Sequence, residues 1–271
     1  MKSYAIYDEE LQRTSAIGYL FCYEKAESFI VELCEDLDEW DAPLLFQGLV
    51  KRGIYTIPRD ISILWVRERV IPSGRQNIGS ILKNHKLKEY SEMAFFQLSK
   101  GKCSQDGCYI TEISEEQIPE KIRNRRMRNI RECFFTEDRQ LVCMLWDNTV
   151  RKVDLTKISK KNNDIAKVLK YKEIYDSVMV GPGGYSVIFN EAIEIGIADL
   201  MESGLVLSLS ANDFYSIIRN NVVDTSRACE MLQCSRQNLS YLVKENKLTP
   251  IICGTKENWY TKGELARVMS E

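Results

Sequence analysis

The most constraining feature of this sequence is a pair of closely spaced helix signals near its C-terminus. Asp224 or Thr225 can cap a first helix, because a short polar side chain accepts hydrogen bonds from the free amides of a helix start. Residues 233–235 form a turn, and Ser235 can cap a second helix. The apolar face of the first helix consists of Ala228, Met231 and Leu232. The small Ala228 lets the helices cross closely, so the sequence predicts a helix-turn-helix.

The second helix has two chemically different sides. The side expected to be buried is apolar and consists of Leu239, Leu242 and Val243. The outer side is polar and consists of Arg236, Gln237, Asn238, Tyr241 and Lys244. In the major groove of DNA, arginine can make paired hydrogen bonds to guanine, and glutamine or asparagine can make them to adenine. The second helix is therefore a candidate recognition helix.

A hairpin is expected after this helix. Asn246 suits the left-handed cap that ends a helix, and two strands follow over residues 248–253 and 257–260. Thr261 can then cap a last helix over residues 262–269. A hairpin in this position is a wing, so the C-terminal residues predict a winged helix-turn-helix.

The order of cap, turn, helix and wing resembles the winged helix-turn-helix of excisionases and MerR-type regulators over about 48 residues. The resemblance is carried by Thr225, Ala228, the pair Ser235-Arg236 and the wing residue Trp259. The chain departs from the family pattern at three places. Asn246 stands where glycine is usual, the proline is displaced to Pro250, and Asn258 replaces the arginine before the tryptophan, which removes one expected phosphate contact.

The resemblance implies a double-stranded DNA partner and a role for each matching residue. Base reading falls to Arg236, Gln237, Asn238 and Tyr241. Contact with the DNA backbone falls to Thr225, Ser235, Lys244, Lys247 and Lys256. With so few cations one copy should bind weakly, so we expect a homodimer on a repeated or palindromic site. Helix-turn-helix geometry also serves protein contacts, and exposed polar residues are often only solvated, so these alternatives stay open.

Charge rises toward the C-terminus, although the total is only -2. Residues 1–118 hold 14 basic and 19 acidic side chains, a net of -5. Residues 119–214 hold 15 and 14, a net of +1, and residues 215–271 hold 8 and 6, a net of +2. We expect three modules with these boundaries, because a chain of 271 residues exceeds one ordinary domain. The slope suits a C-terminal module that faces phosphate, but +2 alone would not predict nucleic-acid binding.

Composition excludes several classes of protein. No apolar run approaches the ~18 residues of a membrane span, and the start lacks a signal-peptide pattern, so we expect a cytoplasmic protein with no membrane partner. The nine cysteines include no CxxC pair and are expected to be reduced. His85 is the only histidine, and zinc needs about four nitrogen or sulfur ligands. We expect no metal, no cofactor, no catalytic residues and no enzyme activity; acidic residues 35–41 remain an alternative divalent-ion site or a solvated turn.

Residues 1–118 predict an α+β module of short elements. Strands are expected at 18–22 and 29–33, although the second run also fits a helical stripe, and a further strand is expected at 61–70. Helices are expected from Pro43 to the residues before Gly53, over 77–85, and over 92–100 with Ser91 as its cap. The basic residues between 121 and 131 mark a boundary. They could lie along a phosphate backbone or form a solvated linker or strand edge.

Residues 119–214 predict a second α+β module. Strands at 140–146 and 150–155 flank the turn residues Asp147-Asn148-Thr149, a short helix follows at 165–170, and a second hairpin joins 177–180 to 185–189 through the turn at 181–184. Residues from about 130 to 204 resemble the small domain called DUF2442, whose pattern contains a hairpin, a VDL segment and a closing strand before a short helix. Asn148 replaces the family's turn glycine, and its Trp-Pro pair is missing. The resemblance implies an interaction domain.

The first module resembles the N-terminal subdomain of HipA-type toxin kinases. The matching residues are Gly18-Tyr19-Leu20, the run from Trp65 to Arg69, Pro72, Arg75-Gln76-Asn77-Ile78 and Tyr90. The kinase motifs have no counterpart in the chain. The resemblance implies a docking or regulatory module, with a protein partner bound through residues 1–118.

Together the modules predict a sequence-specific DNA-binding transcriptional regulator from a toxin-antitoxin or mobile-element system, with autoregulation as one form. The alternative is a protein-interaction adaptor, antitoxin-like or ribonucleoprotein-associated, without sequence-specific DNA binding. For the adaptor, the aromatic residues Trp40, Tyr55 and Trp65 offer either a contact surface or core packing.

Overall fold

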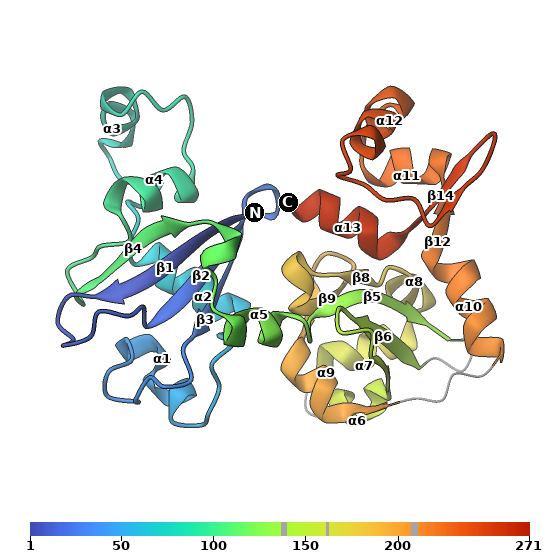
Figure 1. Ribbon diagram of the computed structural model, residues 1–271, viewed down its shortest axis with the longest axis horizontal. Coiled ribbons are helices and arrows are strands. Elements are labelled where there is room, and N and C mark those ends of the chain that lie inside the picture. Colours follow the sequence, from blue (N-terminus) through green and yellow to red (C-terminus); the bar gives the residue numbers. More distant parts are fainter. Residues whose placement is uncertain (137–139, 161–162, 207–210) are drawn as a thin grey trace. The chain divides into compact units, whose positions relative to one another are not determined.

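The computed structural model describes residues 1–136, 140–160, 163–206 and 211–271. Its helices and small antiparallel sheets form the α+β class that the sequence predicts. The chain divides into two compact units, Met1–Ile122 and Arg123–Glu271 (Figure 1). Residues 123–214 and 215–271, which come from two of the expected modules, share the second unit.

The first unit contains an antiparallel sheet in the order β3-β2-β1-β4. Its strands are β1 (Lys2–Asp8), β2 (Gly18–Tyr23), β3 (Ser28–Leu33) and β4 (Cys108–Ile113). β2 and β3 are joined by the short helix η1 (Glu24–Ala26) and pair with Cys22 opposite Phe29. The predicted hairpin is confirmed, and the helical alternative for residues 29–33 is wrong.

Helices α1 (Leu44–Val50), α2 (Arg59–Arg67), α3 (Ile78–Asn84) and α4 (Glu92–Ser99) belong to this unit, as does the short helix η2 (Glu115–Gln117). The predicted helices α1, α3 and α4 are confirmed. Ser91 caps α4 as expected, since its Oγ accepts a hydrogen bond from the Ala94 amide at 3.3 Å. Gly53, with φ +72°, follows the end of α1.

The strand predicted over residues 61–70 is wrong, because α2 occupies most of that segment. The buried residues Ser62, Trp65 and Val66 are spaced by three and four, which is the period of a helix. Ser62 Oγ accepts a hydrogen bond from the Val31 amide at 3.0 Å and so fixes α2 against β3. The β-branched residues of this run misled the prediction, because tertiary packing decides short ambiguous segments.

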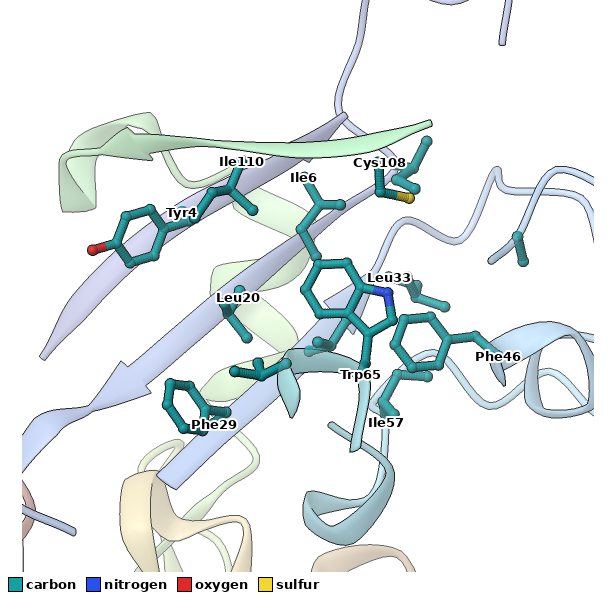
Figure 2. Close-up of a cluster of buried hydrophobic side chains, with 14 of the residues drawn as sticks. Tyr4, Ile6, Leu20, Phe29, Leu33, Phe46, Ile57, Trp65, Cys108 and Ile110 are labelled. Carbon is teal, nitrogen blue, oxygen red and sulfur yellow. The ribbon is translucent and has the colours of Figure 1, made fainter. Parts of the chain in front are cut away.

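Trp65 lies in the core of the first unit among side chains from the sheet and from α1 (Figure 2). Its ring centroid is 5.9 Å from that of Phe46 and 6.0 Å from that of Phe96. Tyr55 packs against the same core, whereas Trp40 is 78% exposed. The three aromatic residues proposed as one contact surface therefore do not form one, and core packing is confirmed for Trp65.

The basic run near residue 121 forms helix α5 (Glu120–Arg126) and then enters strand β5 (Ile130–Phe135). Ile122 is its buried residue, and Lys121, Arg123, Arg128 and Arg131 are exposed. A regular helix covers the first half of the run, and the second half enters β5, an outer strand of its sheet, so the alternative of a solvated strand edge fits Arg131. A contact with a phosphate backbone stays a prediction.

The second unit contains one sheet in the order β11-β7-β6-β5 and another in the order β10-β9-β8. Their strands are β5, β6 (Leu141–Leu145), β7 (Val150–Val153), β8 (Met179–Val180), β9 (Ser186–Phe189), β10 (Ile193–Gly196) and β11 (Gly204–Val206). The helices between them are α6 (Leu155–Ser159), α7 (Asn163–Lys170), α8 (Lys172–Asp176) and α9 (Ile197–Ser203). Both predicted hairpins are confirmed, β6 with β7 and β8 with β9.

In two turns of this unit the backbone conformation explains which residues stand there. Asn148, between β6 and β7, has φ +65°, a value that asparagine tolerates. The glycine cluster at 181–184 is a turn with the short helix η3 (Pro182–Gly184), as expected. Gly184 has φ +73°, and a Cβ on it would lie 2.2 Å from the Ile130 oxygen of β5. Glycine is required there because the turn packs directly on the strand.

The C-terminal part of this unit begins with α10 (Ala211–Asn221), an element that the sequence analysis did not predict. It continues through β12 (Val222–Asp224), α11 (Thr225–Met231), α12 (Arg236–Lys244), β13 (Ile252–Cys253), β14 (Asn258–Thr261) and α13 (Lys262–Ser270). The strands form a sheet in the order β12-β14-β13. The strand predicted over 248–253 is shorter than expected, because Leu248 is instead buried in the loop before β13.

Candidate nucleic-acid interface

Helices α11 and α12 pack against a small core of their own. Ala228, Leu239, Tyr260 and Leu265 are buried there and come from α11, α12, the wing strand β14 and α13. Ala228 has no exposed surface, which fits the close crossing that the sequence predicts. The core fixes which side of α12 faces outward, because Leu239 must point inward.

The two helix caps are built as the sequence suggests. Asp224, rather than Thr225, caps α11: its Oδ1 accepts a hydrogen bond from the Arg227 amide at 2.8 Å. Gln233, with φ +48°, turns the chain between the helices. Ser235 Oγ accepts a hydrogen bond from the Asn238 amide at 3.2 Å and caps α12.

The structure places the predicted base-reading residues together on the outer side of α12. Arg236, Gln237, Asn238 and Tyr241 are all exposed, and Tyr241 retains 52% of its surface. Among the residues predicted to contact the DNA backbone, Ser235, Lys244, Lys247 and Lys256 are also exposed. Thr225 is the one member of the predicted set that is partly buried.

Thr225 has a clear structural task. Its Oγ1 donates a hydrogen bond to the Asn258 oxygen at 3.1 Å and accepts one from the Asn258 amide at 3.2 Å. These bonds tie the start of α11 to the wing strand β14. The hydroxyl therefore positions the wing, and only one of its lone pairs is left for a further contact.

Arg236 lies at the first turn of α12 and is held by a neighbour that the sequence analysis missed. Its Nη2 donates a hydrogen bond to Ser226 Oγ at 2.7 Å. A neutral hydroxyl leaves the guanidinium charge uncompensated, because only an acidic group would balance it. The bond limits the orientations of a long side chain before any ligand arrives.

The outer face carries positive charge that neighbouring carboxylates offset only in part. Within the described residues, Arg236, Lys244, Lys247 and Lys256 form no ion pair, whereas Arg227 pairs with Glu230 at 2.6 Å. Glu245 and Glu257 follow two of these lysines in the chain and reduce the field. The face is therefore modestly, not strongly, attractive to phosphate.

The wing is more apolar than expected. Ile251, Ile252 and Trp259 are exposed, and Ile252 lies opposite Trp259 across the β13–β14 pair. The sequence showed the tryptophan but not that both isoleucines would stand outside. A wing with one lysine and three apolar side chains is suited to close contact, either with DNA sugars or with a protein.

A buried carboxylate fixes this module on the rest of the second unit. Glu132 of β5 accepts hydrogen bonds from Asn221 Nδ2 at 2.8 Å and from the Gly263 amide at 2.9 Å, and a further one from Thr261 Oγ1. Burial raises the pKa of Glu132, while these three donors oppose the rise. A Cβ on Gly263 would lie 2.2 Å from the Arg131 oxygen, so glycine lets α13 approach β5 closely.

A second polar cluster holds the loop between α12 and the wing. Arg267 Nη2 donates to the Lys247 oxygen at 2.6 Å and to Glu264 Oε1 at 2.8 Å. Glu264 Oε1 also accepts from the Thr249 amide at 3.0 Å. Burial pushes the pKa of Glu264 up, but the bonds from Arg267 and Thr249 leave it below its ordinary value. Lys247 is thus carried on a supported loop.

Other kinds of site have little support in the part of the chain that the structure describes. No group of three or more His, Cys, Asp or Glu side chains there could hold a metal ion, and the acidic residues 35–41 form no such group. None of the helices in the described ranges is long and apolar enough to cross a membrane.

Comparison with known proteins gives no relative: no family model matches the chain, and no curated protein or solved structure is significantly similar to it.

Proposed function

We propose that this protein is a sequence-specific DNA-binding transcriptional regulator that inserts α12 into the major groove. One observation carries the proposal: the exposed side of a well-capped helix presents Arg236, Gln237 and Asn238 together, beside cations that have no acidic partner among the described residues. Side chains of these types read base edges, and the first turn of a recognition helix is the part nearest the bases.

The contacts divide into two kinds. Arg236 pairs with guanine, Gln237 and Asn238 pair with adenine, and Tyr241 packs on the bases or sugars farther along α12. Ser235, Lys244, Lys247 and Lys256 contact phosphates, and Thr225 positions the wing that carries Lys256. Three lysines on phosphate give a slope of log K against log salt of about -2.7 for one copy and about -5.4 for two.

The test is selection from random duplexes with the full chain. Arg236→Ala and Gln237→Ala should each relax one position of the selected site, costing about 1 to 3 kcal/mol of discrimination. Arg75→Ala and Gln105→Ala are matched controls, since both side chains are exposed in the first unit. Ser226→Ala separates the hydrogen bond to Arg236 from base reading, because it keeps the guanidinium.

Two outcomes would count against these assignments. If the α12 variants change total binding but not the selected sequence, the residues contact the backbone and do not read bases. If no variant changes binding and the wild type shows no salt-sensitive affinity for any duplex, the DNA proposal is lost.

A protein-interaction adaptor is the second candidate, and the exposed apolar wing favours it. Replacing Ile252 and Trp259 with serine should abolish partner binding in an adaptor while leaving the α12 face intact. In a DNA-binding protein the same pair of changes should weaken binding to all duplexes similarly and leave the selected sequence unchanged.

The first unit supplies the other half of the proposal. Following its resemblance to a docking subdomain, residues 1–118 bind a protein partner of a toxin-antitoxin or mobile-element system, and the protein acts in the cytoplasm, without enzyme activity, on its own promoter. Binding to that promoter with and without the first unit's partner measures this regulation directly.

A further inference from the structure

Helix α10 is amphipathic in the opposite sense to an ordinary surface helix. Three of its large apolar side chains, Phe214, Tyr215 and Ile218, are 56%, 55% and 50% exposed. They form one stripe, since residues three and four apart share a helix face. We call these three residues the α10 stripe. Soluble monomers expose single apolar residues freely, but an aromatic stripe on one helix marks a contact surface.

Apart from the partly buried Ile217, the inward side of α10 is polar, and it is held by specific bonds. Asp213, Ser216 and Asn221 are buried, and α10 packs beside β5 (Figure 1). Asn221 donates to Glu132, and Asn220 Nδ2 donates to the Phe135 oxygen at 3.1 Å. Asp213 accepts from Lys152 Nζ at 3.4 Å. Rolling the helix to bury its stripe would break these bonds, so the outward position is built into the fold.

The chemistry of the stripe limits what can cover it. Phe214, Tyr215 and Ile218 carry no charge, and Arg219, four residues after Tyr215, lies at the edge of the stripe. The stripe therefore offers no acidic group to a basic peptide, and most of its area is apolar. An uncharged apolar surface is complementary to another of the same kind. A second copy of this chain presents one, and a two-fold axis needs only one self-complementary patch.

The area of the stripe predicts a weak contact. Three side chains of this size, half exposed, amount to roughly 300 Å² per copy, on the order of 100 Å² each. A stable standard interface buries about 800 Å² per partner. The stripe alone therefore supports association with a dissociation constant in the micromolar to millimolar range. Two copies bound side by side on one DNA duplex would pair more strongly, because the duplex raises their effective concentration.

We propose that two copies of this chain pair through the α10 stripe, α10 against α10 about a two-fold axis. Because β12 follows α10 without a break, the pairing sets the separation of the two helix-turn-helix modules. The pairing itself does not require that the modules bind DNA; only the consequence for half-site spacing rests on the proposed function.

Sedimentation equilibrium of the full chain without DNA tests the pairing. The wild type should show a reversible monomer–dimer equilibrium, and Ile218→Asp should raise its dissociation constant at least tenfold by placing two charges at the axis. Leu64→Asp is the matched control, because Leu64 is 51% exposed on α2 and lies outside the stripe. Far-UV circular dichroism should be the same for all three proteins.

Hydrogen exchange distinguishes pairing with a second copy from coverage of the stripe by another part of the same chain. In a dimer, amides of 211–221 become more protected as concentration rises from micromolar to millimolar. A wild type that stays monomeric at about 1 mM would overturn the proposal, as would a dimer that Ile218→Asp leaves intact. Protection that is independent of concentration would show that the same chain covers the stripe, and would also overturn it. None of these outcomes alters the duplex selection, so the two proposals fail separately.

Discussion

Helices α10 and α12 lie in the same unit, but α12 exposes its polar side to solvent and α10 exposes its apolar side. α12 buries Leu239 and exposes Arg236, Gln237 and Asn238, whereas α10 buries Asp213, Ser216 and Asn221 and exposes its stripe. The hydrophobic effect positions α12, because its apolar side has a core to enter. Hydrogen bonds to β5, Glu132 and Lys152 position α10.

This difference teaches how each surface can be interpreted. A polar exposed face is the default for any helix, so the face of α12 gains meaning only from its residue types and its cations, which carboxylates offset only in part. An apolar exposed face costs solvation free energy, so the α10 stripe calls for a partner whatever its residue types are. The two surfaces therefore support proposals of different kinds, one for specificity and one for assembly.

The largest expected change in stability comes from truncating an apolar side chain on each of the two helices. Leu239→Ala should destabilise the C-terminal module by about 2 to 5 kcal/mol, because it leaves a cavity in a well-packed core. Phe214→Ala on α10 should change the stability of the monomer by less than about 0.5 kcal/mol, because its side chain is exposed. Hydrogen exchange of peptides covering 222–271 at low protein concentration measures both. Equal effects would show that the sidedness of α10 is misassigned.

A smaller effect tests the polar sides with one substitution at two positions. Asn221→Leu should cost about 1 to 3 kcal/mol, because it removes a hydrogen bond to the buried Glu132 carboxylate. Asn238→Leu should leave stability within about 0.5 kcal/mol, because its side chain is exposed on α12. Urea unfolding of the full chain, followed by fluorescence and by exchange of the same peptides, measures the pair. A neutral Asn221→Leu would mean that α10 is not held by its polar side.

The sequence predicted α12 and missed α10 for one physical reason. The caps Asp224 and Ser235 are local, so a few neighbouring residues announce where those helices begin. In α10 the buried residues are polar, so the usual rule that the apolar stripe faces inward points to the wrong side. Residue 214, placed at the boundary of the expected modules, lies within this helix.

The same distinction applies to the candidate site. The exposed residues of α12 follow from helical periodicity, which is why their common face could be predicted. Three hydrogen bonds of the site join residues from different elements: Arg236 to Ser226, Thr225 to Asn258, and the Gly263 amide of α13 to Glu132. Such contacts depend on how the elements pack and leave no local signal. The prediction of a strand over residues 61–70, where the structure has α2, was wrong for the same reason, because Ser62 is held by a hydrogen bond from β3.

The smallest effect is a pH dependence of the bond network that holds α10. Burial raises the pKa of Glu132 above its ordinary value of 4.5, so between pH 4.5 and the raised value the folded protein holds this proton more tightly than the unfolded chain does. The linked stability is fully present below pH 4.5 and is lost as pH rises through the raised pKa, with a slope of at most about 1.4 kcal/mol per pH unit.

Glu132→Gln cannot titrate, so the free energy of unfolding of the wild type minus that of the variant should fall as pH rises. Glu264→Gln is the control of opposite sign, because the lowered pKa of Glu264 gives stability that is lost as pH falls. Unfolding is measured from about pH 3 to 7.5, because the Glu264 difference changes mainly below pH 4.5 and the Glu132 difference mainly above it. A Glu132 difference that rises with pH, like that of Glu264, would show that this carboxylate is better stabilised as an anion and that α10 is held by a charged anchor.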